Sequence, residues 1–187
     1  MNFCSECGKS LVVIQKQGNL QPLYHCTQCQ QDYANHPKLL VACFISCGDK
    51  LLWMRRGLPP QAGHWAIPAG FMEEGETLRE AAARELREET QVVIAPDKLE
   101  LFMMGTISFI SEVYIAFRAE VDCVDCGCGE EALDVGFFSR EELDWSQVAY
   151  PQANNSIEQA YTDLERGSFS VYHAEMTPDI NALIAIN

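Results

Sequence analysis

One stretch of the chain, GFMEEGETLREAAARELREETQV at residues 70–92, constrains the fold more than any other. Within it, Thr77 and Glu80 have the spacing of a capping box, in which the two side chains close the first turn of a helix. The pattern therefore predicts a loop that ends at Thr77 and a helix over residues 78–91. The stretch holds seven glutamates, so the helix carries a high density of negative charge.

Three of these glutamates, Glu85, Glu88 and Glu89, fall within an arc of roughly 100° on the predicted helix, because each residue advances a helix by about 100°. Like charges at such spacings cost roughly a few tenths of a kcal/mol per pair, and a divalent cation would reverse the sign of that cost. Carboxylate oxygens suit Mg²⁺ or Mn²⁺, which share their remaining coordination positions with substrate phosphates. The alternative is a solvated acidic helix whose charges pair internally, for example Arg84 with Glu88.

The charged positions belong to a longer pattern: Gly70, five residues, Glu76, seven residues, and then RELREETQV at residues 84–92. This pattern resembles the signature of the Nudix hydrolases, GX5EX7REUXEEXGU with U an aliphatic residue, at all of its charged positions. One position departs, because Gln91 stands where the family has glycine. A glycine there serves a left-handed turn, which glutamine adopts at a cost of roughly 1 kcal/mol.

In Nudix enzymes the loop–helix–loop holds metal ions over a diphosphate joined to another group, and a metal-activated water attacks one phosphorus. The resemblance implies an α/β fold, the Nudix α/β/α sandwich with a mixed sheet. Carried over by position, the ligands of Mg²⁺ or Mn²⁺ would be Glu85, Glu88 and Glu89, with the carbonyl of Ala69 a further candidate. Arg84 would orient these carboxylates and Glu76 would stabilise the loop, while Glu85 is also a candidate for the catalytic base.

Further candidates lie outside the signature. Glu131 and Asp134 stand where relatives often place another acid, so either could be a metal ligand or the catalytic base; the alternative is a solvated entry to a strand. Arg55 and Arg56 end a predicted strand just before the loop and could contact phosphate. For these two arginines the alternative is a pair that only faces solvent.

An adenine or flavin ring needs an aromatic or apolar platform. Phe71, Phe109 and Tyr114 are candidates for this platform, although each would also suit the core. Of the three, we assign Phe71 to substrate binding. Trp65 is expected in the core, and we assign no catalytic role to His64.

Residues 1–37 contain two Cys-x2-Cys pairs separated by 18 residues. The pairs are Cys4 with Cys7 and Cys26 with Cys29. They suit a tetrahedral thiolate site with Zn–S bonds of about 2.3 Å and predict a small zinc ribbon; two local disulfides or four unrelated thiols are the alternative. The segment between them predicts a hairpin that turns near Gly18 and Asn19 and is too short to build a core, so structural Zn²⁺ would supply most of its folding free energy.

From residue 38 onward, strand-like and helical patterns are interleaved without a regular repeat. The strand patterns lie at residues 39–46, 50–56 and 132–138 and twice within 99–121. A second helix is expected over residues 154–166, ended by Gly167. This mixture predicts one α/β domain with a mixed sheet over residues 38–187.

The net charge of −14, from 27 acidic and 13 basic residues, argues against a surface that follows nucleic-acid phosphates. Near the ribbon the only bases are Lys9, Lys16 and Lys38, which favours a structural or dimer-forming role for it. No apolar run approaches the roughly 18 to 20 residues of a membrane span, and the N-terminus has no signal pattern, so we expect a cytoplasmic protein.

The nine cysteines are an odd number in a chain without a secretion signal, which favours thiols over a disulfide framework. Cys123, Cys126 and Cys128 crowd one loop and could suggest a second metal. Three thiols without a fourth partner argue against that site.

A zinc ribbon directly before a Nudix domain resembles a bacterial and plant group regarded as ADP-ribose or FAD pyrophosphatases. The likeness runs through LLVACFISCGDKLLWMRR, HWAIPAGFMEEGE and the C-terminal FSVYH. It implies a small-molecule nucleotide substrate, FAD or ADP-ribose, cleaved to AMP plus FMN or ribose 5-phosphate. Most such hydrolases assemble as dimers and the ribbon could contribute to a homodimer contact, but nothing in the sequence identifies an interface, so the oligomeric state stays open.

Two alternatives to this function stay open. An NADH pyrophosphatase is one, although those relatives carry SQPWPFPxS after the signature, where this chain reads LELFMMGTISFISE. The other is a nucleotide-sensing regulator whose ribbon binds DNA. The complete set of signature carboxylates and the acidic charge both count against the regulator.

Overall fold

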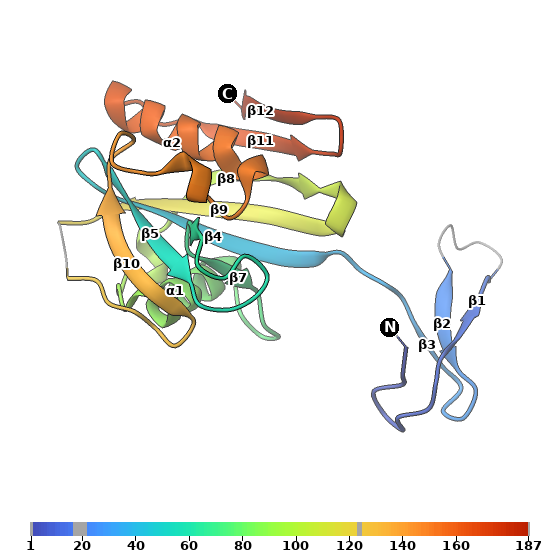
Figure 1. The fold of residues 1–187 in the computed structure, drawn as a ribbon. Helices are drawn as coiled ribbons and strands as arrows, with labels where there is room; N and C mark the ends of the chain where they lie inside the picture. The colour runs from blue at the N-terminus through green and yellow to red at the C-terminus, as the bar shows by residue number, and fades with distance from the viewer. Residues whose placement is uncertain (1, 17–21, 123–124, 187) are drawn as a thin grey trace. The chain divides into compact units, whose positions relative to one another are not determined.

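The chain folds as two compact units, Met1–Pro37 and Lys38–Asn187, in a computed structural model that describes residues 2–16, 22–122 and 125–186. Each unit has a sheet of its own, with three strands in the first and nine in the second (Figure 1). Since few residues of the first unit are buried, the two units depend on different sources of stability.

The first unit is a small antiparallel sheet of β1 (Val12–Ile14), β2 (Leu23–Cys26) and β3 (Gln31–Tyr33), in that order. The predicted pairing across the hairpin is present, because β1 and β2 are antiparallel neighbours. The predicted turn at Gly18 and Asn19 lies outside the described residues. Cys4 and Cys26 are the two buried residues among those described in this unit, so the sheet has no apolar core of its own.

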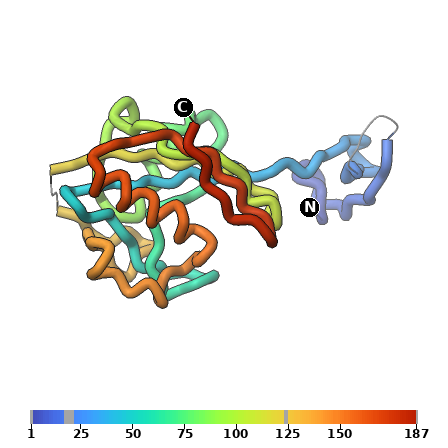
Figure 2. Tube along the Cα trace, turned by 90° about the horizontal axis from the view of Figure 1, so that it is seen from above, coloured from blue at the N-terminus to red at the C-terminus, as the bar shows by residue number. Residues whose placement is uncertain are grey.

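The second unit is built on a mixed sheet with the strand order β10-β5-β4-β9-β8-β11-β12, while β6 pairs with β5 and β7 pairs with β4. The strands are β4 (Lys38–Cys47), β5 (Lys50–Arg56), β6 (Trp65–Ala66), β7 (Ala69–Phe71), β8 (Glu100–Ile107), β9 (Glu112–Glu120), β10 (Ala132–Phe138), β11 (Val171–Met176) and β12 (Asn181–Ile186). The pairs β4/β9 and β8/β11 are parallel and the others are antiparallel, so the predicted mixed sheet is confirmed. The C-terminal strands extend the sheet beyond β8 (Figure 2).

Helices α1 (Leu78–Thr90) and α2 (Asn154–Arg166) cover opposite faces of this sheet. Successive side chains of a strand point to opposite faces. Accordingly Cys43 of β4 packs in the cluster that contains Leu86 of α1, whereas Phe44 packs in the cluster that contains Tyr161 of α2. Short 3-10 helices complete the connections: η1 (Pro96–Lys98), η2 (Ser108–Ile110), η3 (Trp145–Gln147) and η4 (Pro151–Ala153).

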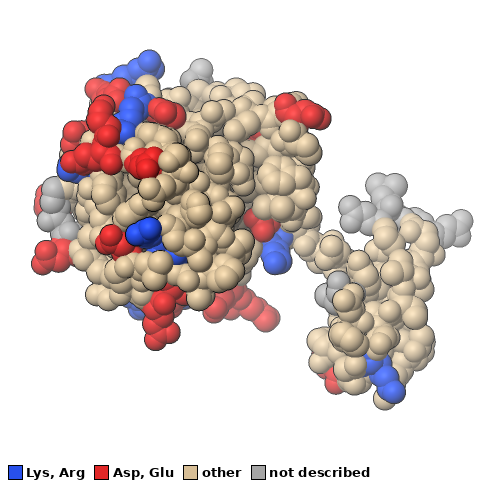
Figure 3. Space-filling model, in the orientation of Figure 1, with Lys and Arg blue, Asp and Glu red and all other residues tan. Residues whose placement is uncertain are grey.

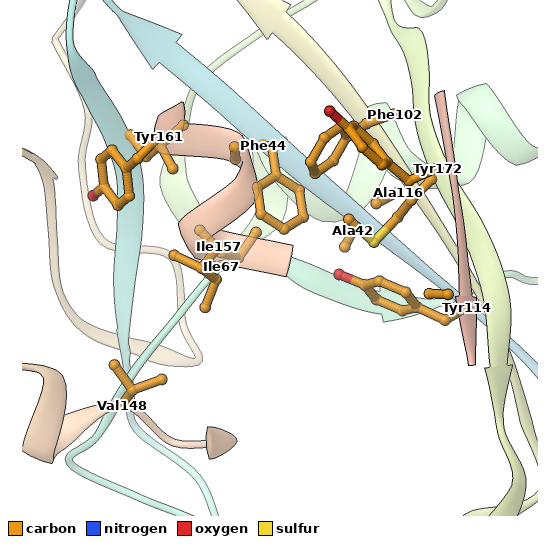
Figure 4. Close-up of a cluster of buried hydrophobic side chains, with 14 of the residues drawn as sticks. Ala42, Phe44, Ile67, Phe102, Tyr114, Ala116, Val148, Ile157, Tyr161 and Tyr172 are labelled. Carbon is orange, nitrogen blue, oxygen red and sulfur yellow. The ribbon is translucent and has the colours of Figure 1, made fainter. Parts of the chain in front are cut away.

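The core under α2 is held by aromatic rings that meet edge to face (Figure 4). Phe102 is 1% exposed, and its ring centroid lies 4.8 Å from that of Phe44 and 5.6 Å from that of Tyr172. Replacing Phe102 by alanine should lower the free energy of unfolding by about 3–5 kcal/mol, because it removes buried area and leaves a cavity. Urea unfolding of the full chain measures this.

The matched control is Leu133→Ala, since Leu133 is 61% exposed. This change should lower the free energy of unfolding by less than about 0.5 kcal/mol. If Phe102→Ala were no more destabilising than Leu133→Ala, the packing described for this core would be wrong.

Candidate active site

The signature stretch forms a loop and a helix, as its sequence predicts. The side chain of Thr77 accepts from the N–H of Glu80, and the side chain of Glu80 accepts from the N–H of Thr77, so the capping box is present. Strand β7, which precedes the loop in the chain, passes directly beside helix α1. A Cβ atom at Gly70 would lie 2.0 Å from Cδ of Glu85, so a larger residue at this position would displace the Glu85 carboxylate.

Arg84 is the centre of the charge network. Its Nε donates to Glu76 at 2.6 Å, and its Nη1 donates to Glu85 at 2.8 Å and to Glu88 at 3.2 Å. Its Nη2 donates to the carbonyl of Phe71 at 3.0 Å, which ties the helix to the end of β7. The Arg84 guanidinium, helped by the N–H of Glu73, lowers the pKa of Glu76 to about 2. The family resemblance implies that Arg84 orients the carboxylates and that Glu76 stabilises the loop. These contacts are compatible with both roles.

Glu89 is the most buried carboxylate of the signature, with 6% of its surface exposed. Its Oε2 accepts from the N–H of Ala69 at 2.9 Å. Burial raises the pKa of Glu89 to about 8 and also raises the pKa of Glu85, in both cases against the effect of nearby donors. A cation at this position would stabilise the ionised forms of both side chains.

The signature carboxylates do not converge on one point in this structure. Among the described residues, only four cysteines bring three or more ligand atoms within 4.8 Å of one another. Glu88 lies 49% exposed and is paired with Arg84 and, at 3.6 Å, with Arg87. Glu85 and Glu89 still offer oxygen donors of the type that Mg²⁺ and Mn²⁺ prefer. All three carboxylates would suit such an ion if the Glu88 side chain rotated away from Arg84 and Arg87.

Glu131 and Asp134, the two candidate acids outside the signature, have different surroundings in the structure. Glu131 follows Gly129, whose N–H donates to the carbonyl of Glu89 at 3.0 Å, so its backbone lies near the end of α1. Burial is the main cause that raises the pKa of Glu85 and Glu89, and the negative charge of Glu131 acts in the same direction. Asp134 instead accepts from the N–H of Val135 through its own Oδ1 and is exposed on β10. Glu131 is therefore the better-placed acid.

Arg55 and Arg56 at the end of β5 are both half-buried. Arg55 donates from Nε to the carbonyl of Gly63 at 2.7 Å. Arg56 donates from Nε to the carbonyl of Pro60 at 3.0 Å. Its Cζ atom lies over the ring of Tyr150, 5.5 Å from the ring centroid. Arg56 pairs in the sheet with Ala132, the residue after Glu131, and its positive charge partly offsets the burial that raises the pKa of Glu89.

The three aromatic candidates differ in exposure. Phe71 is 42% exposed with Lys38 Nζ 4.8 Å from its ring centre, and Phe109 is 47% exposed in η2, where it lines a shallow hollow of about 370 Å³. Tyr114 is buried in the core (Figure 4), and Trp65 packs against that core as predicted. Sequence reasoning missed Lys38 and Tyr150 as neighbours of the candidate residues, because nothing local to either residue marks them.

The four predicted zinc ligands come together in the first unit. Cys4 and Cys29 have their sulfurs 3.9 Å apart, and those of Cys7 and Cys26 are 3.6 Å apart. A tetrahedral site with Zn–S bonds of about 2.3 Å separates its sulfurs by about 3.8 Å, so the cluster fits zinc. A hydrogen bond with the Tyr33 hydroxyl, 3.1 Å from the Cys4 sulfur, lowers the pKa of Cys4 to about 6, as suits a thiolate ligand.

The other cysteines behave differently. Cys126 and Cys128 are free thiols, and Cys123 lies outside the described residues. Cys47 is disulfide-bonded, which is an exception to the free or metal-bound thiols that the sequence favoured. Cys47 stands outside any spaced cysteine motif, so the sequence could not have predicted this bond.

Comparison with known proteins supplies the family. The family model of the NUDIX domain matches residues 36–162. The chain belongs to the NUDIX family. This confirms the resemblance that the signature suggested, and it agrees with the mixed-sheet α/β fold.

Among curated NUDIX relatives, an ADP-ribose pyrophosphatase from Methanocaldococcus jannaschii is 41% identical over 114 residues, which cover 58% of this chain and 65% of that protein. The NAD-capped RNA hydrolase NudC from Photobacterium profundum is 28% identical over 141 residues, 74% of this chain and 50% of that protein. The chain thus spans between half and two thirds of the length of these relatives. No helix among the described residues has the length and apolar character needed to cross a membrane.

Solved NUDIX structures share the fold. The crystal structure of a NUDIX hydrolase from Nitrosomonas europaea matches with a TM-score of 0.81 and 31% identity, covering 94% of this chain and 99% of that one. The NUDIX domain of NrtR from Shewanella oneidensis, solved with ADP ribose, matches with a TM-score of 0.61 and 22% identity over 70% of this chain and 90% of that one. The second likeness shows the fold alone.

Proposed function

We propose that the chain is a divalent-metal-dependent pyrophosphohydrolase that cleaves the diphosphate of ADP-ribose or FAD, giving AMP plus ribose 5-phosphate or FMN. One observation carries the proposal: the carboxylates of Glu85 and Glu89 are both mostly buried against strand β7, the first beside Gly70 and the second bonded to the N–H of Ala69. Burial raises the pKa of both groups. Burying carboxylates without enough cations is costly, and a divalent ion offsets that cost. NUDIX hydrolases as a family use such ions and act on nucleotides.

The proposed ligands are Glu85, Glu88 and Glu89, with the Ala69 carbonyl as a further candidate. When bound, Mg²⁺ or Mn²⁺ supplies charge neutralisation at the phosphates and a more acidic water. Residues of the chain hold these ligands in position. Arg84 orients Glu85 and Glu88, the N–H of Ala69 holds Glu89, and Gly70 lets the loop approach the helix.

The remaining residues bind substrate or move a proton. Arg55 and Arg56 bind phosphate oxygens, since both lie at the strand end that leads into the site. Phe71 offers an exposed ring face beside the loop for the base or flavin. Glu85 and Glu131 are the candidates for the group that takes the proton from the attacking water.

The relatives support ADP-ribose over the other substrates, because the ADP-ribose pyrophosphatase is the more identical of the two curated proteins described above. An NADH or NAD-type substrate is the second candidate, favoured by the NudC relatives. Long RNA is disfavoured, because the chain carries a net charge of −14 and the face in Figure 3 shows acidic side chains with only scattered basic ones. That charge also counts against a DNA-binding regulator.

For the first unit we propose a structural zinc ion held by the four clustered sulfurs of Cys4, Cys7, Cys26 and Cys29. The support is the sulfur spacing and the near absence of other buried residues in this unit. The ribbon is proposed as a folding element or a dimer contact and not as a nucleic-acid reader.

A product assay tests the function. The full chain is incubated with ADP-ribose, FAD, NADH and 8-oxo-dGTP, each with MgCl₂ and with EDTA, and the products are separated by chromatography. We expect Mg²⁺-dependent release of AMP with ribose 5-phosphate or FMN. Turnover of NADH alone would move the assignment to the second candidate, and turnover of none would contradict the proposed function.

The buried Glu89 also predicts a pH-dependent effect of Mg²⁺ on stability. Its pKa is about 8 in the folded, metal-free protein and 4.5 ordinarily, so between these values the folded state holds a proton that the unfolded chain releases. The metal-free protein should therefore lose stability as pH rises from about 4.5 to 8. MgCl₂ should raise the Tm by at least about 3 °C more at pH 8 than at pH 5, measured by scanning calorimetry after dialysis against magnesium-free buffer.

The control for this measurement is Glu89→Gln, which removes the titrating group. The difference between the Mg²⁺ effects at the two pH values should be smaller in this variant, and Glu85, whose pKa burial also raises, accounts for what remains. An equal effect of pH in the variant and the unmodified protein would show that Glu89 is not the group responsible.

A further inference from the structure

Gln91, which stands where the NUDIX signature has glycine, takes over two tasks at the end of α1. Its backbone is left-handed, with φ 59° and ψ 3°, and its N–H donates to the carbonyl of Arg87 at 2.9 Å, so it caps the helix as a glycine would. Its side chain does what no glycine can. The amide Nε2 donates to the carbonyl of Cys128 at 2.7 Å.

The loop that contains Cys128 also binds the end of α1 through its backbone. The N–H of Gly127 donates to the carbonyl of Thr90 at 2.9 Å, and the N–H of Gly129 donates to the carbonyl of Glu89 at 3.0 Å. Carbonyls in the last turn of a helix have no partner within the helix, so the loop satisfies two of them. A Cβ atom at Gly129 would lie 1.6 Å from the carbonyl oxygen of Glu88, so this loop can lie here only with glycine at that position.

The same loop leads directly to Glu131, the acid placed beside the signature. The carbonyl of Glu131 accepts from the N–H of Gly57 at 2.7 Å, at the residue that follows Arg56. The loop is therefore fixed at one end to α1 and at the other to the end of β5. Glu131 is itself exposed, so contacts of its neighbours must hold it in place.

We propose that Gln91 is a positioning residue whose side-chain amide ties the carbonyl of Cys128 to the end of α1 and so holds Glu131 beside Glu85 and Glu89. The effect on catalysis through Glu131 rests on the proposed function. The hydrogen bond between Gln91 and the carbonyl of Cys128 does not. A chain with glycine at this position keeps the helix cap and loses the tie. Of the three hydrogen bonds that join the described part of the loop to the end of α1, only the two from the glycine N–H groups then remain.

Gln91→Gly tests the proposal, because it keeps the left-handed turn without strain and removes only the amide. A global loss of stability is therefore not expected, and unchanged Tm is the first check. In the zinc-loaded full chain without added Mg²⁺, amide exchange followed by NMR should be at least about 10-fold faster at Gly127 and Gly129. With Mg²⁺ and ADP-ribose, kcat should fall at least about 5-fold while KM stays within about 2-fold.

Gln91→Glu is the matched variant, since it has the same length and cannot donate to a carbonyl. It should reproduce the faster exchange. In the background Glu131→Gln, Gln91→Gly should have no further effect on kcat, because the residue through which it acts is already gone.

Unchanged exchange at both glycines in Gln91→Gly would overturn the tie. Additive losses of kcat in the double variant would overturn the route through Glu131. If the unmodified protein hydrolyses no tested nucleotide, the proposed function fails, and the exchange rates at Gly127 and Gly129 still decide whether Gln91 holds the loop.

Discussion

Replacing Glu88 by glutamine should lower kcat for ADP-ribose by at least about 100-fold while shifting the Tm by less than about 2 °C. Glu88 is 49% exposed, and its contacts with Arg84 and Arg87 are surface ion pairs, which contribute about 0–1 kcal/mol of stability each. Its proposed role as a metal ligand predicts a much larger effect on kcat. Losing a ligand weakens the binding of the ion that neutralises the phosphates. Kinetics with varied MgCl₂ and thermal unfolding measure the two effects.

Glu74→Gln is the matched control, because Glu74 is an exposed glutamate in the same stretch and outside the signature positions. Its kcat should stay within about 2-fold of the unmodified protein. Turnover of Glu88→Gln near that of Glu74→Gln would rule out the proposed metal role of Glu88.

Removing one sulfur from the ribbon should have an equally large effect on folding. Cys26→Ser should unfold residues 1–37 and abolish zinc binding, because Cys26 is fully buried and the unit has almost no other buried residue. Structural zinc contributes about 10–16 kcal/mol in comparable peptides, far more than this small sheet can replace. The unmodified chain should bind one zinc ion by atomic emission, and the variant none.

NMR spectra of the full chain locate the effect. Amide signals of residues 1–37 should collapse to unfolded positions in Cys26→Ser, while those of the Lys38–Asn187 unit stay dispersed, because that unit has its own core. Cys128→Ser, at an exposed thiol outside the ribbon, should change neither zinc content nor these spectra. A ribbon that remains folded without zinc would contradict the proposed site.

The helix and its cap were predictable because their signals are local. Thr77 and Glu80 specify the start of α1 through contacts three residues apart, and the observed helix ends one residue before the predicted limit. The strand at residues 132–138 matches β10, since alternation is also a local pattern. The sulfur cluster was predictable because metal geometry links two distant pairs through a known spacing.

Features that depend on distant partners were not predictable. The turn of Glu88 toward its arginines depends on side-chain contacts that no spacing rule describes. The sequence marked Gln91 only as a departure from the signature, because its partner Cys128 lies 37 positions away. The short strand β7 was missed for a similar reason, since its three residues are extended only through pairing with β4.

The sulfur cluster and the signature carboxylates select cations of opposite hardness, which affects how a chelator acts on this protein. Soft thiolates favour zinc and hard oxygens favour magnesium, so EDTA should strip both proposed ions, and only the oxygen site should refill when MgCl₂ alone is returned. Activity measured at that point comes from a chain whose ribbon is still unfolded. Full recovery would show that hydrolysis is independent of the ribbon, and recovery only after zinc is added back would show that the two units work as one enzyme.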